Sequence, residues 1–204
     1  MALFYQHNIN DSAELAVWHI TEPEDFFTRE VQLQYTIPNP HKRLQHLAGR
    51  YLLKILDQDF PLHEIEIMES RKPRLKDSSR HFSISHCGDY AAALLSEGSL
   101  AGIDVEKITP KIEAVKTKFM GEGELSILPS HAPEIITLCW SAKEAVYKWY
   151  GLGLLSFKNH IVITNIHVWD KVGVVHINFR MGTPRDLKIQ FRFFDNICLA
   201  WMVA

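Results

Sequence analysis

Each half of this 204-residue chain contains one long helical pattern set among shorter strand-like runs. The first helix is expected to begin at Asn39-Pro40, with asparagine as N-cap and proline in the first turn, and to run to about Leu56. The second is expected over 133–150, where Gly151 follows in the position that commonly ends a helix. One principal helix and several strands per half predict an α+β protein built from two similar lobes.

Apolar runs on both sides of these helices predict strands. We expect strands at residues 15–20, 65–69, 81–85, 90–96 and 100–106. Thr21-Glu22-Pro23-Glu24 resembles a capping box that opens a short helix, a further helix is expected over 110–119, and residues 160–204 are strand-rich with a hairpin turn at Asp195-Asn196. Glu97-Gly98-Ser99 is the best candidate hinge, which predicts lobes of residues 1–98 and 99–204.

The composition is that of an ordinary globular protein, with 47% hydrophobic and 23% charged residues. A formal net charge of −2 gives no global indication of nucleic-acid binding. Cys87, Cys139 and Cys198 lack the close spacing of zinc or redox motifs, which favours reduced thiols. The chain shows no secretory signal and no apolar run of membrane-spanning length, so we expect a cytoplasmic protein without nucleic-acid or membrane partners.

Two acidic residues alternate with apolar residues in Gly102-Ile103-Asp104-Val105-Glu106. On a strand, residues two apart point to the same face, so Asp104 and Glu106 are predicted to present paired carboxylates. Neighbouring carboxylates repel one another unless a cation lies between them, and an oxygen-only pair suits Mg²⁺. The alternative interpretation is an ordinary acidic strand end that faces water.

A second motif, Trp140-Ser141-Ala142-Lys143-Glu144-Ala145-Val146-Tyr147-Lys148, falls in the predicted second helix. Glu144 and Lys148 are four residues apart and share one helix face. One interpretation is a surface ion pair that contributes little stability. The other makes Glu144 a third metal ligand and Lys148 a cation beside a phosphate. The apolar neighbours indicate that this helix is partly buried, which raises the cost of a charged pair without a role.

Basic side chains gather in the first half. Arg43, His46, Arg50 and Lys54 recur at helical spacing, and residues 71–80 are rich in lysine and arginine. This turn leads into Ser85-His86, so the region could hold phosphates through charge-assisted hydrogen bonds. The alternative is a solvated basic face. No Gly-x-Ser-x-Gly elbow is present, which argues against a hydrolase triad.

The ordered motifs resemble the paired signature of the 4′-phosphopantetheinyl transferase superfamily. Residues 102–106 and 140–148 look like its two acidic blocks, residues 83–87 resemble its Asn-x-Ser-His-Ser segment, and 71–73 resemble its Gly-Lys-Pro turn. The length and N-terminal extension resemble the surfactin-synthetase-activating type. That type is a single-chain, monomeric pseudo-dimer with its active site in the cleft between lobes.

The resemblance implies a role for each matching residue. Asp104, Glu106 and Glu144 would hold Mg²⁺, with Mn²⁺ as an alternative ion, and Lys148 would neutralise the departing adenosine 3′,5′-bisphosphate. Coenzyme A, the co-substrate, would be held by Arg43, Arg50, Lys72, Ser85 and His86. Glu144, or Glu124 through a metal-bound water, would take the proton of the attacking serine, with Glu122 as the alternative to Glu124. Ser83, Cys87 and Arg71 depart from the family pattern, and these departures concern coenzyme A binding only.

The implied reaction transfers 4′-phosphopantetheine from coenzyme A to a serine of an apo acyl or peptidyl carrier protein. Three alternatives remain open on the sequence: a catalytically inactive coenzyme A-binding relative, a Mg²⁺-dependent diphosphate hydrolase, and a protein-interaction module. The hydrolase lacks the acidic helix box expected for that chemistry. The interaction module leaves the ordered motifs unexplained.

Overall fold

The computed structural model describes residues 3–76 and 79–204. Residues 1–2 of the predicted first lobe and 77–78 of the basic turn lie outside the described residues. By its internal contacts the chain divides into a first unit, Met1–Ile103 with Val203–Ala204, and a second unit, Asp104–Met202. The division falls inside strand β7 (Ala101–Lys107), beyond the hinge expected near Gly98.

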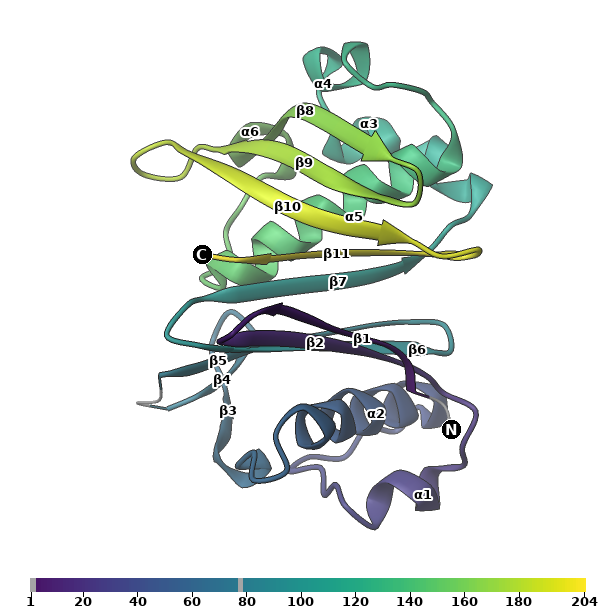
Figure 1. Cartoon of the computed structure of the whole chain (residues 1–204), viewed down its shortest axis with the longest axis vertical. Helices are drawn as coiled ribbons and strands as arrows, with labels where there is room; N and C mark the ends of the chain where they lie inside the picture. Colours follow the sequence, from purple (N-terminus) through teal and green to yellow (C-terminus); the bar gives the residue numbers. More distant parts are fainter. Residues whose placement is uncertain (1–2, 77–78) are drawn as a thin grey trace. The chain divides into compact units, whose positions relative to one another are not determined.

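The first unit is built on an antiparallel sheet with the strand order β1-β2-β6-β5 and one long helix, α2, that lies along the sheet (Figure 1). Small elements complete it, including a separate two-stranded sheet, β3-β4. The elements are β1 (Leu3–Asn10), β2 (Ala13–His19), α1 (Glu24–Thr28), α2 (Pro40–Leu56), the 3₁₀ helix η1 (Leu62–Glu64), β3 (Ile65–Ile67), β4 (Pro73–Leu75), β5 (Arg80–Cys87) and β6 (Tyr90–Glu97).

Helix α2 begins as its sequence predicts, because the side chain of Asn39 accepts a hydrogen bond from the Lys42 N–H at 2.9 Å. Its apolar face packs on the sheet, with Leu47 and Leu53 buried in the core. Gly49 permits an unusually close approach to β5, since a Cβ there would lie 2.6 Å from Cγ2 of Ile84. The middle of α2 is therefore held against the strand that carries Ser85 and His86.

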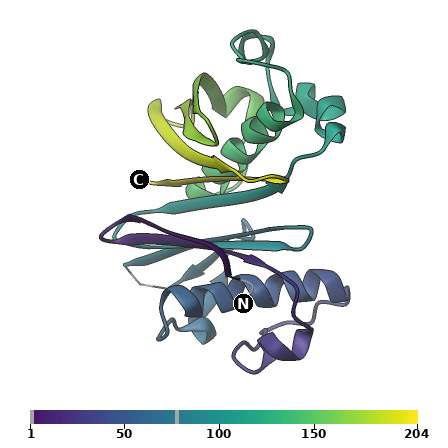
Figure 2. The ribbon, with the colours of Figure 1, turned by 45° about the vertical axis from the view of Figure 1, so that its right-hand side comes forward.

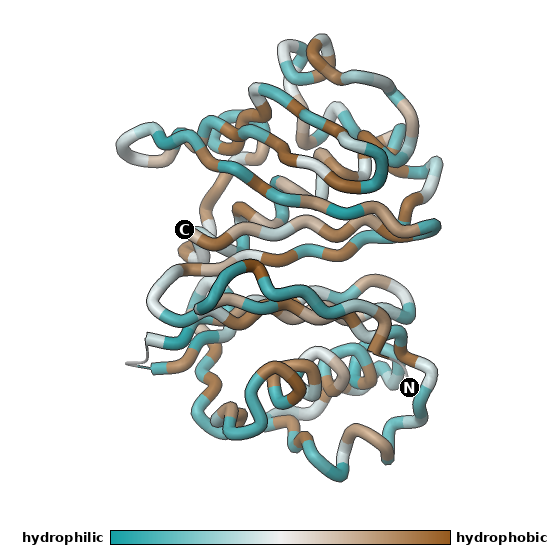
Figure 3. Tube along the Cα trace, viewed as in Figure 1, coloured by the Kyte–Doolittle hydropathy of each residue, from teal (hydrophilic) through white to brown (hydrophobic). Residues whose placement is uncertain are grey.

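The second unit contains a five-stranded sheet with the order β7-β11-β10-β9-β8 and the long helix α5 (Figure 2). The remaining elements are the 3₁₀ helix η2 (Pro110–Val115), α3 (Lys116–Phe119), α4 (Glu122–Ser126), α5 (Pro133–Tyr150), α6 (Phe157–His160), β8 (Ile161–Trp169), β9 (Val172–Phe179), β10 (Arg185–Phe193) and β11 (Ile197–Val203). Apolar residues of α5 and of the inner face of the sheet form a single core. The hydropathy colouring shows apolar and polar residues alternating along the strands (Figure 3).

Helix α5 ends where the sequence predicts. Gly151 adopts a left-handed conformation with a φ of 71°, and its N–H donates to the Tyr147 carbonyl at 3.0 Å. Only glycine adopts this conformation without strain, so the position of the helix end follows from the sequence. Ile136 and Val146 of this helix are fully buried against the sheet.

The α+β class is confirmed, and both long helices lie where they were expected. Residues 3–10, to which the sequence analysis assigned no element, form strand β1, and the basic turn contains the short strand β4. The helix expected over 110–119 is a 3₁₀ turn followed by one α-helical turn. The predicted capping box at residues 21–24 is wrong, because α1 starts after Pro23 without a side-chain cap. Within the described residues, no helix combines the length and apolarity needed to cross a membrane.

Candidate functional site

An acidic cluster in the second unit is built from one strand and one helix. β7 carries Asp104 and Glu106, and α5 carries Glu144 and Lys148. Because residues four apart share one face of a helix, Trp140, Glu144 and Lys148 form a single stripe along α5. Contacts from this helix reach both acidic residues of the strand. The two motifs of the second half thus meet in the structure.

Asp104 is the most enclosed member of the cluster, with 2% of its surface exposed. Lys148 Nζ donates to Asp104 Oδ1 at 2.7 Å, and Ser141 Oγ donates to Asp104 Oδ2 at 2.8 Å. A buried carboxylate is costly unless its charge and its lone pairs are both matched. Lys148 supplies the charge and Ser141 the second hydrogen bond, so the Asp104 carboxylate is held in one orientation.

The other two carboxylates are more open. Trp140 Nε1 donates to Glu106 Oε1 at 3.1 Å. The pKa of Glu144 is raised to about 7, mainly by burial and further by the negative charges of Asp104 and Glu106, while Lys148 opposes the shift. The three acidic side chains are therefore close enough to repel one another electrostatically.

The donor set of this cluster matches a hard divalent cation, because it consists of carboxylate oxygens whose mutual repulsion a cation would relieve. In the described part of the chain, however, no three His, Cys, Asp or Glu side chains are arranged to hold one ion together. The ammonium group of Lys148 instead provides the positive charge at Asp104. The chemistry of the residues fits Mg²⁺, and the assignment of the three ligands stays a prediction.

A cavity of about 700 Å³ opens beside Glu144 within the second unit. Its walls are largely aromatic: the ring of Trp140 lies 5.1 Å from that of Phe119 and 5.3 Å from that of Phe157. Val115, Lys118, Tyr147 and Ser156 complete the lining. The pocket therefore combines an apolar wall with a carboxylate and a lysine at its edge, a combination typical of small-molecule sites.

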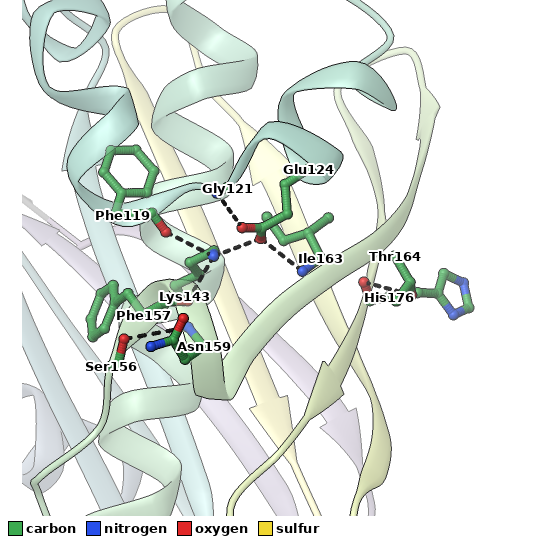
Figure 4. A network of polar contacts seen from close by, with 10 residues as sticks. All are labelled: Phe119, Gly121, Glu124, Lys143, Ser156, Phe157, Asn159, Ile163, Thr164 and His176. Carbon is green, nitrogen blue, oxygen red and sulfur yellow. Dashed lines mark hydrogen bonds and ion pairs between the residues drawn. The ribbon is translucent and has the colours of Figure 1, made fainter.

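Glu124, predicted as a candidate base, lies in a different network (Figure 4). Its Oε1 lies 2.6 Å from Lys143 Nζ and accepts the Ile163 N–H at 2.9 Å, and its Oε2 accepts the Gly121 N–H at 2.8 Å. Only 3% of its surface is exposed. Because both oxygens are occupied by internal donors, these contacts do not support the expected role of Glu124 as a base.

Lys143 completes this network from the adjacent position on α5. It is fully buried and also donates to the carbonyl oxygens of Phe119 and Phe157, each at 2.9 Å. Burial lowers the pKa of its ammonium group, and Glu124 opposes that shift. The pair links α3, α4, α6 and β8 to α5, which positions the aromatic wall of the cavity.

Two arginines of α2, both predicted to hold coenzyme A, differ in their environment. Arg43 donates to both carboxylate oxygens of Glu24, at 2.7 and 2.9 Å, and to the Ile37 carbonyl at 2.8 Å. Its charge is therefore already matched. Arg50 is 7% exposed, and among residues 3–76 and 79–204 no carboxylate forms an ion pair with it.

The other first-unit residues predicted to hold coenzyme A come from β5, which carries Ser85 and His86, and from the turn between β3 and β4, which carries Lys72. The imidazole of His86 lies 5.1 Å from that of His46, the residue one turn before Arg50. Ser85 precedes His86 on β5 and is 5% exposed. Burial lowers the pKa of Lys72 to about 8. This buried basic character suits an anion.

Several residues with clear roles in these clusters were not predicted. In the sequence Trp140 and Ser141 are only parts of a motif, yet in the structure they donate hydrogen bonds to Glu106 and Asp104. Their spacing to Glu144 and Lys148 on one helix could have indicated this. Ser83, noted only as a departure from the family pattern, accepts the Ile103 N–H at 3.1 Å.

Comparison with known proteins agrees with these motifs. Residues 101–196 match the family model of the 4′-phosphopantetheinyl transferase superfamily. A Haemophilus influenzae protein provisionally named 4′-phosphopantetheinyl transferase is 33% identical over 128 residues, which are 58% of this chain and 54% of that protein. Enterobactin synthase component D of Salmonella typhimurium is 31% identical over 115 residues, 54% of this chain and 49% of that protein.

The 4′-phosphopantetheinyl transferase AcpT of Escherichia coli K12 is 33% identical over 126 residues, 58% of this chain and 64% of that protein. The chain therefore spans between 49% and 64% of the length of these three curated relatives. The matched family segment contains the whole acidic cluster, from Asp104 to Lys148.

Proposed function

We propose that this chain, whose residues 101–196 match the family model of the 4′-phosphopantetheinyl transferase superfamily, is a member of that superfamily and transfers 4′-phosphopantetheine from coenzyme A to a serine of an apo carrier protein. The other product would be adenosine 3′,5′-bisphosphate. The observation that carries the proposal is the buried Asp104, held between Lys148 and Ser141 inside the matched segment. Such an arrangement concentrates opposite charges where a diphosphate could be cleaved.

The acidic residues would hold Mg²⁺ through the carboxylates of Asp104, Glu106 and Glu144. When bound, the ion would offset negative charge on the diphosphate. Lys148, whose ammonium group already lies in the cluster, would stabilise charge on the departing nucleotide. Phosphoryl transfer needs mainly positioning and electrostatic stabilisation from the protein, and both are properties of this cluster.

The serine of the carrier must lose a proton during the attack. Glu144 is our candidate acceptor because it is the carboxylate that lines the aromatic cavity. Such general-base catalysis typically contributes about 10²–10⁴-fold in rate. We leave Glu124 out of the catalytic set, since its oxygens are occupied within the network of Figure 4.

Residues of the first unit would hold the nucleotide part of coenzyme A. Arg50, Lys72, Ser85 and His86 form our proposed set, because Arg50 is buried and burial also lowers the pKa of Lys72, so that an anion would offset the cost of both charges. Arg43 is left out because Glu24 already matches its charge. We further propose that the protein acts as a monomer on acyl or peptidyl carrier proteins, as the resemblance to the single-chain type implies.

Incubation of the protein with coenzyme A, Mg²⁺ and an apo carrier protein tests the proposal. Intact-mass measurement should show the carrier gaining the mass of phosphopantetheine, and Asp104→Asn and Lys148→Met should abolish the gain. Asp195→Asn is the matched control, because Asp195 is 95% exposed in a surface ion pair of the second unit. Cleavage of coenzyme A without a carrier would indicate a hydrolase, and coenzyme A binding without reaction an inactive relative. Either outcome would contradict the proposal.

A further inference from the structure

A closed ring of polar contacts surrounds the guanidinium group of Arg50 in the first unit. Arg50 Nη2 donates to Tyr35 Oη at 3.4 Å, and Tyr35 Oη lies 3.2 Å from His46 Nδ1. Arg50 Nη1 donates to the His46 carbonyl at 3.2 Å and lies 3.5 Å from His46 Nδ1. The guanidinium carbon also lies 5.8 Å from the centre of the Tyr35 ring. Neither Tyr35 nor His46 belongs to the proposed set of coenzyme A contacts.

The direction of these contacts determines the state of the imidazole. A guanidinium group has only donors, so His46 Nδ1 must act as an acceptor toward it and carries no proton. The hydroxyl of Tyr35 can then accept from Arg50 and donate to His46 at the same time. Burial, reinforced by the positive charges of His86, Arg50 and Lys42, lowers the pKa of His46 to about 4. His46 is therefore neutral near neutral pH.

Within the described residues, the ring brings no negative charge to Arg50. Its contacts go to a hydroxyl, a carbonyl and a neutral imidazole. These partners orient the guanidinium group but do not neutralise it. They also use only part of its five N–H donors, so the others can bond to an anion. Arg43, seven residues earlier on α2, shows the opposite case, with its carboxylate partner in place.

We propose that Tyr35 and His46 are positioning residues that hold the Arg50 guanidinium group ready for a phosphate group of the coenzyme. The inference rests on the function proposed above, in which Arg50 binds coenzyme A. Tyr35 acts through Arg50 and not on the ligand directly. The ligand class that best suits this guanidinium group is a phosphate ester, because its planar fork of N–H donors can bind two phosphate oxygens at once.

Calorimetric titration of the full chain with coenzyme A tests this role. Tyr35→Phe keeps the ring and removes the hydroxyl, and we expect roughly tenfold weaker binding, the effect of one hydrogen bond to a charged group. Tyr5→Phe, a partly exposed tyrosine of the same unit, is the matched control and should bind as wild type does. Tyr35 is 40% exposed, so its substitution should leave the thermal midpoint of unfolding nearly unchanged.

A double-mutant cycle separates positioning from an independent contribution. If Tyr35 acts through Arg50, the double variant Tyr35→Phe/Arg50→Lys should bind coenzyme A no more weakly than Arg50→Lys alone. If the two substitutions weaken coenzyme A binding independently, so that their fold-losses multiply in the double variant, the inference is overturned. It is also overturned if Tyr35→Phe binds coenzyme A as tightly as Tyr5→Phe. His46→Ala should also weaken binding, and His46→Asn, which can restore an acceptor, should recover part of the loss.

These experiments distinguish a failure of the positioning role from a failure of the proposed transfer reaction. A wild-type chain that binds coenzyme A but does not modify a carrier would contradict the proposed function and leave the Tyr35 effect measurable. A wild-type chain that transfers phosphopantetheine, with a Tyr35→Phe variant of unchanged affinity, would contradict the positioning role alone. A chain with no affinity for coenzyme A would contradict both.

Discussion

Replacing Lys143 by methionine should destabilise the protein strongly, although the residue lies outside the acidic cluster. Its ammonium group is fully buried and serves three oxygens: Glu124 Oε1 at 2.6 Å and the carbonyls of Phe119 and Phe157 at 2.9 Å each. Methionine keeps most of the apolar stem and removes the charge. Glu124, itself 3% exposed, would then be a buried carboxylate without a counter-charge.

Breaking a buried ion pair by removing one partner typically costs about 3–5 kcal/mol. The two carbonyl oxygens that lose their donor would add to this cost, at about 1–3 kcal/mol for each that stays unsatisfied. We therefore expect a loss of at least about 3 kcal/mol. For a chain of this size, that loss corresponds to a thermal midpoint roughly 6–12 °C lower.

Thermal unfolding followed by circular dichroism measures this shift, with Lys171→Met as the matched control. Lys171 pairs with Asp195 on the surface, where the side chains are 56% and 95% exposed, so its loss should cost less than about 1 kcal/mol. Glu124→Gln combined with Lys143→Met should be less destabilised than the sum of the single variants, because the uncompensated charge is gone. A Lys143→Met midpoint equal to that of the surface control would refute the reasoning.

Two further predictions concern the first unit. Because burial lowers the pKa of Lys72 to about 8, its ammonium group is charged below that pH and loses its proton above it. The affinity for coenzyme A should therefore fall as pH rises through about 8. Binding titrations from about pH 6.5 to about pH 9.5 should show this fall in wild type but not in Lys72→Arg. Gly49→Ala places a Cβ 2.6 Å from Ile84 Cγ2 and should destabilise the protein by about 1–3 kcal/mol, a loss that Ile84→Ala in the same chain should partly reverse in thermal unfolding.

The two long helices were predictable because their end signals are local. The Asn39 side chain caps α2 through a residue three positions on, and Gly151 ends α5 through its own backbone conformation. Strand β1 has no comparable local signal. Its residues are alternately exposed and half-buried, and its neighbour β2 provides the pairing that defines it. The sequence of an edge strand without a fully buried face gives little periodicity to detect.

The acidic cluster was predictable in outline for a related reason. Strand and helix periodicities place Asp104 beside Glu106 and Glu144 above Lys148 without any knowledge of the fold. What could not be predicted is the partner of each charge. The family resemblance implies that Glu124 is a candidate base, whereas in the structure its carboxylate pairs with Lys143, which is 19 positions away and next to Glu144.

Arg43 and Arg50 show most directly what the fold adds. They lie on the same face of α2 at helical spacing, and the sequence predicts one role for both. In the structure Glu24 reaches Arg43 from the neighbouring helix α1, while Tyr35 and His46 reach Arg50 and bring no negative charge. A buried cation with orienting partners but no counter-charge is costly on its own, and an anionic ligand would offset that cost. The distinction between a structural and a ligand-binding arginine therefore depends on which side chain the fold brings to each, and not on the helix that carries them.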